Sequence, residues 1–261
     1  MCLLVVAWLS HPRYRLVVAG NRDEFHDRAA APLGWWTDEP AILAGRDLRA
    51  GGTWLGVARS GRYGFLTNFR DAEPVAAADG APSRGQLVPG FLRDAAPPAG
   101  FLDALRGNAR RFAGFSLLVG DRRGLHYYTN AGDAAPRALP PGIYGLSNHR
   151  LDEPWPKLVR TRERFATVLA REEPDAAALL DVLADAAPAG DAAACPATPG
   201  LPADLERALS APFVRHERYG TRCSTVLQVD GDGRTVVHER RFDTAGAQTG
   251  ATRIEFRDAA T

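Results

Sequence analysis

The sequence predicts an α+β fold, in which antiparallel strands form layered sheets and helices come in separate blocks. Apolar, Val-rich runs recur with Gly, Pro, Asn and Asp between them, as is typical of strands joined by turns. Helical spacing is confined to a few stretches, and no regular strand–helix–strand alternation is visible. A chain of 261 residues buries roughly three quarters of its unfolded surface, so it needs no disulfide or metal to complete a core.

The strands are predicted first. Residues 2–9 and 14–20 are apolar runs separated by Ser10-His11-Pro12-Arg13, which indicates a hairpin buried on both faces. Turn residues delimit the other runs, and Asp230-Gly231-Asp232-Gly233 favours a hairpin turn over a calcium loop because the downstream acidic ligands are missing. The further predicted strands are residues 41–44, 53–58, 64–68, 115–119, 125–129, 222–229, 235–242 and 252–257.

Helical spacing is clearest in residues 155–170, where Trp155, Leu158, Phe165 and Leu169 keep one apolar face and arginines fill the other. The other predicted helices are residues 86–94, 101–111 and 175–186. The segment 188–202 is rich in Pro, Ala and Gly, so we expect a flexible loop near it within a single domain over residues 1–261.

The charge balance excludes several classes of function. With 32 Lys and Arg against 31 Asp and Glu, the chain lacks the basic surface that nucleic-acid binding requires. The apolar run 1–9 is about half the roughly 20 residues of a spanning helix, and no basic residue precedes it. We therefore expect a cytoplasmic protein with no transmembrane segment. Lys157 is the only lysine among many arginines and alanines, which is typical of a GC-rich bacterial genome and leaves a lysine mechanism only this residue.

The three cysteines, Cys2, Cys195 and Cys223, form no CxxC pair, so we expect free thiols in a reducing compartment and no metal site. Cys223 lies in an apolar strand pattern and Cys195 in the Pro-rich segment. Cys2 differs by its position, because methionine is removed ahead of small residues. A first-residue cysteine would combine a thiol of pKa about 8.5 with an α-amine of pKa about 7.7 to 8.0, which is a nucleophile with its own base.

Polar residues gather where the second predicted strand ends, in Gly20-Asn21-Arg22-Asp23-Glu24-Phe25. A hairpin returns this end to Cys2, so Asp23 is placed to hydrogen-bond the α-ammonium and Arg22 to stabilise a thiolate. The alternative is a charged turn with a surface Arg–Asp pair. Two further segments, Leu66-Thr67-Asn68 and Leu146-Ser147-Asn148, both follow apolar stretches and end in asparagine.

On these residues the sequence resembles the NRDE family, which includes the transport-and-Golgi-organisation proteins. The matching motifs are Met1-Cys2, Asn21-Arg22-Asp23-Glu24, Gly51-Gly52-Thr53-Trp54-Leu55-Gly56, Leu66-Thr67-Asn68-Phe69, Tyr144-Gly145-Leu146-Ser147-Asn148, Pro154-Trp155-Pro156-Lys157-Leu158 and Tyr219-Gly220-Thr221-Arg222. The resemblance implies an N-terminal-nucleophile (Ntn) hydrolase-like four-layer αββα sandwich of mainly antiparallel sheets, with the strand that carries Cys2 central in one sheet.

The family in turn resembles the cysteine Ntn amidases, the penicillin V acylases and bile salt hydrolases. This implies that Cys2 is the nucleophile, that Asp23 orients its amine, that Asn68 and Asn148 form the oxyanion hole, and that Arg222 supports the nucleophile. The sequence departs from the acylases at one position: their arginine precedes the orienting aspartate by three residues, where this chain has Gly20, and here the arginine is the adjacent Arg22.

Two functions stay open at this point. The first is a Cys2-dependent amide hydrolase that acts on a small acylated substrate without a cofactor. The second, implied by the family's association with haem handling, is a non-enzymatic haem-binding or haem-trafficking protein, for which His26 and His149 beside the polar motifs are the candidate ligands. Both functions imply a small-molecule partner and a monomer or homodimer.

Overall fold

The computed structural model describes residues 3–70, 80–132, 134–190 and 200–259. Cys2, Cys195 and most of the predicted flexible loop near 188–202 lie outside the described residues. The chain divides into two compact units, each built on its own sheet. Unit 1 comprises Met1–Asp27, Pro141–Ser147 and Leu151–Glu255, and unit 2 comprises Arg28–Pro140, Asn148–Arg150 and Phe256–Thr261.

The sheet of unit 1 begins with the predicted hairpin. Its six strands, counted over the described residues, run in the order β10-β1-β2-β11-β12-β13. Neighbouring strands from β10 to β12 pair antiparallel. Strands β1 and β2 are interior strands of the sheet, and both of their faces are buried over their apolar runs. The bounds are β1 Leu3–Trp8, β2 Tyr14–Phe25, β10 Gly142–Leu146, β11 Tyr219–Asp230, β12 Arg234–Phe242 and β13 Gln248–Arg257.

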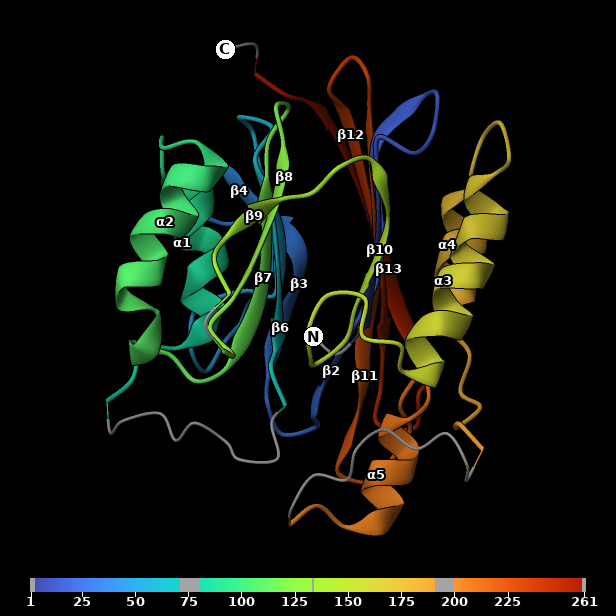
Figure 1. Ribbon diagram of the computed structural model, residues 1–261. Helices are drawn as coiled ribbons and strands as arrows, with labels where there is room; N and C mark the ends of the chain where they lie inside the picture. The colour runs from blue at the N-terminus through green and yellow to red at the C-terminus, as the bar shows by residue number, and fades with distance from the viewer. Residues whose placement is uncertain (1–2, 71–79, 133, 191–199, 260–261) are drawn as a thin grey trace. The chain divides into compact units, whose positions relative to one another are not determined.

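Helices α3 (Pro156–Leu169) and α4 (Ala176–Val182) cover one face of this sheet (Figure 1). Pro156 occupies the first helical position of α3, where its missing N–H costs nothing. Asp175 caps α4 by accepting hydrogen bonds from Ala177 N–H and Ala178 N–H. A third helix, α5 (Ala203–Leu209), packs Leu205 and Leu209 on Val214. The core between the sheet and α3 and α4 contains Leu3, Val5, Ala7, Val17, Ala19, Leu158, Phe165, Leu179, Leu183 and Val226.

The single lysine belongs to this packing. Lys157 lies in the first turn of α3, as predicted, with 2% of its surface exposed. Its Nζ donates a hydrogen bond to the Leu209 carbonyl at the end of α5, at 2.7 Å. Lys157 therefore joins two helices of unit 1.

The sheet of unit 2 is a meander. Seven strands of the described chain follow one another in sequence order, and each pairs antiparallel with the next. Their bounds are β3 Ala30–Trp35, β4 Ile42–Asp47, β5 Leu55–Ala58, β6 Tyr63–Asn68, β7 Phe115–Gly120, β8 Leu125–Thr129 and β9 Arg137–Ala138. This connectivity explains the Gly-rich turns between the short apolar runs.

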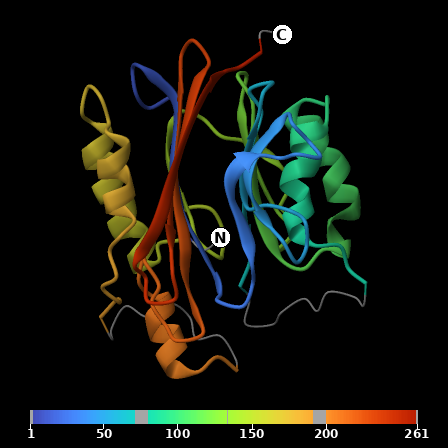
Figure 2. The same ribbon diagram turned by 180° about the vertical axis from the view of Figure 1, so that it is seen from behind.

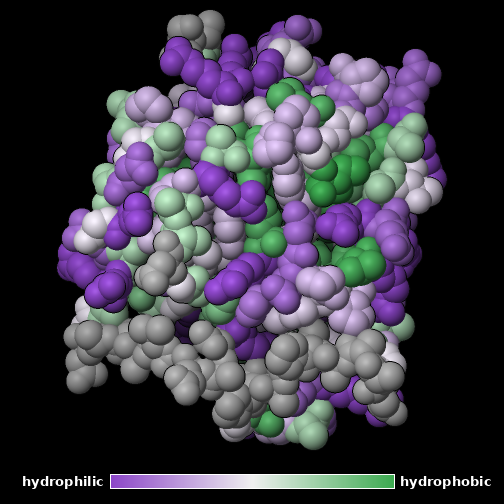
Figure 3. All heavy atoms as spheres, in the orientation of Figure 1, coloured by the Kyte–Doolittle hydropathy of each residue, from purple (hydrophilic) through white to green (hydrophobic). Residues whose placement is uncertain are grey.

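Helices α1 (Leu87–Arg93) and α2 (Pro98–Asn108) cover one face of the second sheet, as Figure 2 shows from behind. Leu102 of α2 is fully buried, whereas Asp103 and Arg106 are exposed, so the polar side of this helix forms the hydrophilic left edge in Figure 3. The buried Arg62 ties α1 to the sheet, because its Nε donates to the Phe91 carbonyl at 3.1 Å and its guanidinium lies over the Phe91 ring.

The predicted α+β class and the hairpins are confirmed, and the differences are local. Strand β2 continues five residues beyond the predicted end at residue 20, and α4 ends at Val182 instead of residue 186. No element was predicted at β3, β9, β10 or α5. The expectation of a single domain over residues 1–261 stays a prediction.

Two glycines of unit 2 differ in whether the structure has room for a Cβ atom, so they can be compared by substitution with alanine. A Cβ on Gly52 would lie 2.3 Å from the Gly85 carbonyl oxygen, which accepts a hydrogen bond from Thr53 N–H, whereas a Cβ on Gly107 in α2 meets nothing within 4 Å. We expect Gly52→Ala to lower the free energy of unfolding by about 2 kcal/mol or more, and Gly107→Ala to raise it by about 0.5 kcal/mol. Urea unfolding checks both, and equal effects of the two substitutions would contradict the close contact.

Candidate functional site

The polar motif Asn21-Arg22-Asp23-Glu24 is part of β2 and lies inside the protein. Asn21, Arg22 and Asp23 have 0%, 3% and 2% of their surface exposed, so the alternative of a charged surface turn is wrong. Side chains alternate along a strand, so Asn21 and Asp23 share the helix-covered face with Ala19, while Arg22 and Glu24 point to the opposite face. Buried polar groups of this kind need hydrogen-bond partners.

Asn21 connects the sheet to the segments beside it. Its Nδ2 donates to the Leu183 carbonyl at 3.0 Å and to the Pro212 carbonyl at 2.8 Å, and its Oδ1 accepts from Ser224 Oγ of β11 at 2.6 Å. Two carbonyl partners on one side fix the orientation of the amide. Asn21 is therefore a structural residue of the motif.

Asp23 is held by two residues of the neighbouring strand β11. Thr221 Oγ1 accepts from Val214 N–H at 2.9 Å, so its one proton is donated to Asp23 Oδ1 at 2.6 Å. The Tyr219 hydroxyl donates to the Asp23 carbonyl oxygen at 2.9 Å. A buried carboxylate with a fixed orientation can hold an ammonium group in one place.

Arg222 occupies a β-bulge between β11 and β2. Thr221 pairs with Asp23 and Cys223 pairs with Arg22, which leaves Arg222 as the extra residue of β11. A bulge redirects the side chain of the extra residue. The bulge therefore explains how the Arg222 side chain reaches a partner that it would not reach if side chains alternated regularly along β11.

That partner is His26. Arg222 Nη1 lies 2.9 Å from His26 Nδ1, and His26 Nε2 lies 2.9 Å from the His216 carbonyl oxygen. A guanidinium only donates, so Nδ1 accepts and the proton of the neutral imidazole is on Nε2. Gly220 makes room for this ring, because a Cβ at Gly220 would lie 3.0 Å from His26 Cε1. His26 thus positions Arg222, and both its ring nitrogens are engaged.

The opposite face of the sheet carries Arg22. Its Nη2 lies 3.8 Å from Glu24 Oε2, and its strand neighbour Cys223 is buried. Burial raises the pKa of the Cys223 thiol, and the negative charge of Glu239 raises it further. Cys223 therefore stays protonated and inaccessible, in agreement with its predicted packing role.

The two predicted oxyanion asparagines lie beside each other in unit 2. Asn148 Nδ2 donates to the main-chain carbonyl oxygen of Asn68 at 3.1 Å, and Arg70 N–H donates to the main-chain carbonyl oxygen of Asn148 at 2.7 Å. Asn148 adopts φ +32°, a left-handed conformation that asparagine tolerates better than most residues, and its buried Oδ1 has no hydrogen-bond partner among the described residues. His149 follows it, with its ring 4.6 Å from that of Phe69.

The structure thus brings Arg22, Asp23 and Arg222 together on adjacent strands of unit 1, and Asn68 and Asn148 together in unit 2. Thr221 and Tyr219 were missed as residues that hold Asp23, although both belong to the Tyr219-Gly220-Thr221-Arg222 motif that the sequence contains. The described residues contain no group of three or more His, Cys, Asp or Glu side chains placed to hold a metal ion. Among the described helices, none has the length and apolar character to cross a membrane.

A family model and individual related sequences all assign the chain to one family. A family model described as Transport and Golgi organisation 2 (TANGO2) matches residues 1–244. The Transport and Golgi organization protein 2 homolog of Bos taurus is 34% identical over 262 residues, which covers 92% of both chains. The Homo sapiens homolog is 33% identical over 258 residues, with the same coverage of each chain.

Comparison with solved structures tests the fold. A penicillin V acylase from Agrobacterium tumefaciens matches with a TM-score of 0.55 at 13% identity, over 97% of this chain and 86% of the acylase. The Caenorhabditis elegans ortholog of an N-acylethanolamine-hydrolyzing acid amidase matches with a TM-score of 0.52 at 14% identity, over 87% of this chain and 92% of the amidase. These likenesses confirm the predicted Ntn-hydrolase-like fold class.

The partners of Asn21 predict a large effect on stability. Asn21→Ala would leave two buried carbonyls and the Ser224 hydroxyl without their partner, so we expect a loss of about 3 kcal/mol in the free energy of unfolding. The control is Asn108→Ala at the exposed end of α2, with an expected change within about 0.5 kcal/mol. Urea unfolding followed by circular dichroism measures both, and a change in Asn21→Ala as small as in the control would contradict the anchoring role.

Proposed function

Because the chain belongs to the TANGO2 family and has the fold of Ntn-hydrolase-type acylases, we propose that it is an amide hydrolase whose nucleophile is Cys2 after removal of Met1. The observation that carries the proposal is the buried, doubly held Asp23. Nothing about the hairpin itself requires a carboxylate there, since β2 is apolar from Leu16 to Ala19 on both faces. A buried charge without a function is a cost to stability.

Sequence and register support the pairing of Asp23 with the α-amine. Leu3, which follows Cys2 in the sequence, pairs with Asn21 of β2, and Asp23 lies two residues further along the same strand. In the proposed role, Asp23 accepts hydrogen bonds from the α-ammonium and orients the amine after it loses its proton. Thr221 and Tyr219 are positioning residues: Thr221 holds the carboxylate, and Tyr219 holds the main-chain carbonyl of Asp23.

The chemistry needs no cofactor. The α-amine of Cys2 takes the thiol proton, the sulfur attacks the amide carbonyl carbon, and a C–S bond forms. The C–N bond then breaks, and the leaving amine takes the proton from the α-ammonium. Water, deprotonated by the same amine, hydrolyses the thioester, which releases the carboxylic acid and restores the thiol.

Two arginines supply positive charge for the anionic states. The Arg22 side chain lies on the face of β2 opposite to that of Asp23. Arg222 lies at the bulge, where His26 fixes its position. A cation near a thiol favours the thiolate, and a cation near the carbonyl oxygen favours the tetrahedral intermediate. We assign Arg22 to the thiolate and Arg222 to support of the nucleophile.

The substrate class follows from the same proposal. Two proteins with this fold are named as a penicillin V acylase and an N-acylethanolamine-hydrolyzing amidase, so a small N-acylated amide is the first substrate to test. The oxyanion roles of Asn68 and Asn148, haem binding at His26 or His149, a cytoplasmic location and a monomer or homodimer stay predictions. Haem ligation by His26 has less support, because both of its ring nitrogens are hydrogen-bonded.

Activity on a fluorogenic N-acyl aminocoumarin tests the role of Asp23. We expect Cys2→Ala to abolish turnover and Asp23→Asn to lower kcat about 100-fold, because a misplaced amine no longer serves as the base. Thr221→Val should lower kcat as well, and Thr221→Ser, which keeps the hydroxyl, should restore it. Asp103→Asn, an exposed carboxylate of α2, is the control. Full activity of Asp23→Asn, with a circular dichroism spectrum like that of the control, would contradict the proposed role of Asp23 in orienting the amine.

Thiol reactivity tests the nucleophile independently of any substrate. We expect intact mass to show loss of Met1 and iodoacetamide at pH 7 to modify Cys2, while Cys223 stays unmodified because burial raises its pKa. Comparison of the wild type with Cys2→Ser and Cys223→Ser locates the label by peptide mapping. Retention of Met1, or labelling of Cys195 or Cys223 in preference to Cys2, would rule out the mechanism.

A further inference from the structure

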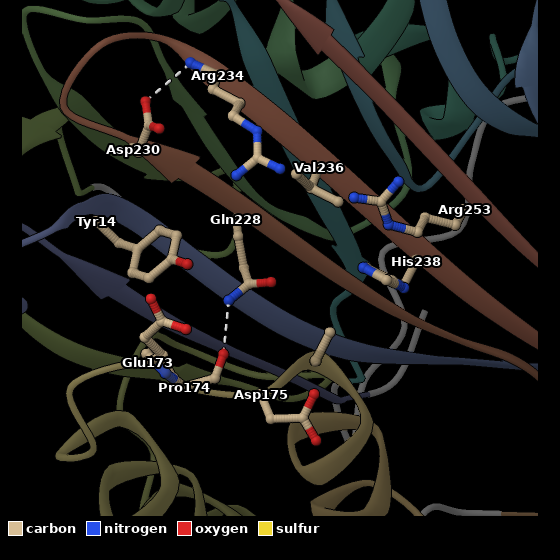
Figure 4. A pocket seen from close by; sticks show the side chains of 11 residues that line it. Tyr14, Glu173, Pro174, Asp175, Gln228, Asp230, Arg234, Val236, His238 and Arg253 are labelled. Carbon is tan, nitrogen blue, oxygen red and sulfur yellow. Dashed lines mark hydrogen bonds between the residues drawn. The ribbon is translucent and has the colours of Figure 1, made fainter.

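A cavity of about 280 Å³ lies in unit 1, at the end of β2 away from Asp23. It opens on the helix-covered face of the sheet, beside the connection that leads into α4. Its walls come from the start of β2, the ends of β11 and β12 that meet at their hairpin, β13, and residues 173–176 (Figure 4). The proposed hydrolase uses none of these residues.

The middle of the cavity is lined by polar groups that have hydrogen-bonding capacity left over. Gln228 is 6% exposed, and its Nε2 donates to the Pro174 carbonyl at 2.8 Å. Its Oε1, the Tyr14 hydroxyl and the His238 ring have no hydrogen-bond partner among the described residues. Figure 4 shows these three side chains in a row across the cavity. These groups are therefore available for hydrogen bonds with water or with a ligand in the cavity.

One side of this row carries two arginines, Arg234 and Arg253. Arg234 Nε and Arg253 Nη2 each donate to one oxygen of Glu255, both at 2.5 Å. These hydrogen bonds, Arg234 first, lower the pKa of Glu255 to about 2, so the carboxylate stays ionised and keeps the two guanidiniums together. Each guanidinium retains further N–H donors. Asp230 also lines this side of the cavity and accepts from the Arg234 backbone N–H at 2.9 Å, so the two guanidiniums are balanced by two carboxylates, and this side offers a ligand N–H donors without a net charge. Guanidinium N–H donors are well suited to bind a carboxylate.

The other side of the row is acidic. Glu173 and Asp175 lie across the cavity from Arg234 and Arg253 in Figure 4. Glu173 forms an ion pair with Arg13, and Asp175 accepts from the N–H groups of Ala177 and Ala178 at the start of α4. Both carboxylates are therefore held in place at the wall that faces the arginines.

We propose that this cavity binds a small zwitterion of the amino-acid or short-peptide type. The carboxylate of the ligand lies on Arg234 and Arg253, its ammonium on Glu173 and Asp175, and its amide on Gln228 and His238. The separation of the two charged walls by a row of uncharged hydrogen-bonding groups favours a ligand with separated charges and a peptide group between them. A dianion would meet Glu173 and Asp175, and a dication would meet the arginines, at a repulsive cost.

The first experiment uses the full chain and the dipeptide glycylglycine in isothermal titration calorimetry. We expect binding of glycylglycine and an affinity at least about tenfold lower for N-acetylglycylglycine, which lacks the ammonium, and for glycylglycinamide, which lacks the carboxylate. Absence of binding at millimolar glycylglycine, or equal affinity for the blocked peptides, would overturn the proposal.

The second experiment tests which residues contact the carboxylate and which contact the ammonium of the ligand. It substitutes exposed residues, for which we expect no loss of the fold. Arg253→Gln should weaken glycylglycine about tenfold and leave glycylglycinamide unchanged, because only the carboxylate contact is lost. Glu173→Gln should weaken glycylglycine and leave N-acetylglycylglycine unchanged. Arg257→Gln, an exposed residue of β13 that does not line the cavity, is the matched control. Identical affinity profiles of Arg253→Gln and Arg257→Gln would refute the assignment, and hydrolase activity plays no part in either readout.

Discussion

The burial of consecutive polar residues in the middle of a sheet is the constraint on which the rest of unit 1 depends. Asn21, Arg22 and Asp23 continue an apolar strand without leaving the interior, so each needs partners that water would otherwise supply. The pairing of β2 with β11 provides partners for Asn21 through Ser224 and for Asp23 through Thr221. The positions of α4 and of the segment at Pro212 follow, because Asn21 bonds their carbonyls.

Much of the fold could be predicted because its strands obey simple patterns. The apolar runs of β1 and β2, the hairpins and the amphipathic α3 follow from local periodicity, which does not depend on distant residues. The missed elements have weak local signals. Strand β3 contains Pro32 and Gly34, lies at a sheet edge and has only one buried residue. Strand β9 has only two residues, and β10 has five, two of which are glycines. Helix α5 is seven residues long and is stabilised by packing on Val214.

The site was predictable in residue type and only partly in geometry. The family motifs gave Arg22, Asp23 and Arg222, and the structure brings them to neighbouring strands. The sequence could not show that Thr221 and Tyr219 hold Asp23, since this depends on the register of two strands almost 200 residues apart. Nor could it show the bulge that turns Arg222 toward His26, because a single extra residue in a strand has no periodic signature.

The position of the single lysine has a consequence for chemistry at the chain terminus. Lys157 is the only lysine of the sequence, and its ammonium is buried against the Leu209 carbonyl. An acylating reagent directed at primary amines therefore finds no lysine on the surface of the folded protein, which leaves the α-amino group as its target. Because the same group is the proposed base, the chain offers a way to block or tag its catalytic amine selectively without any substitution.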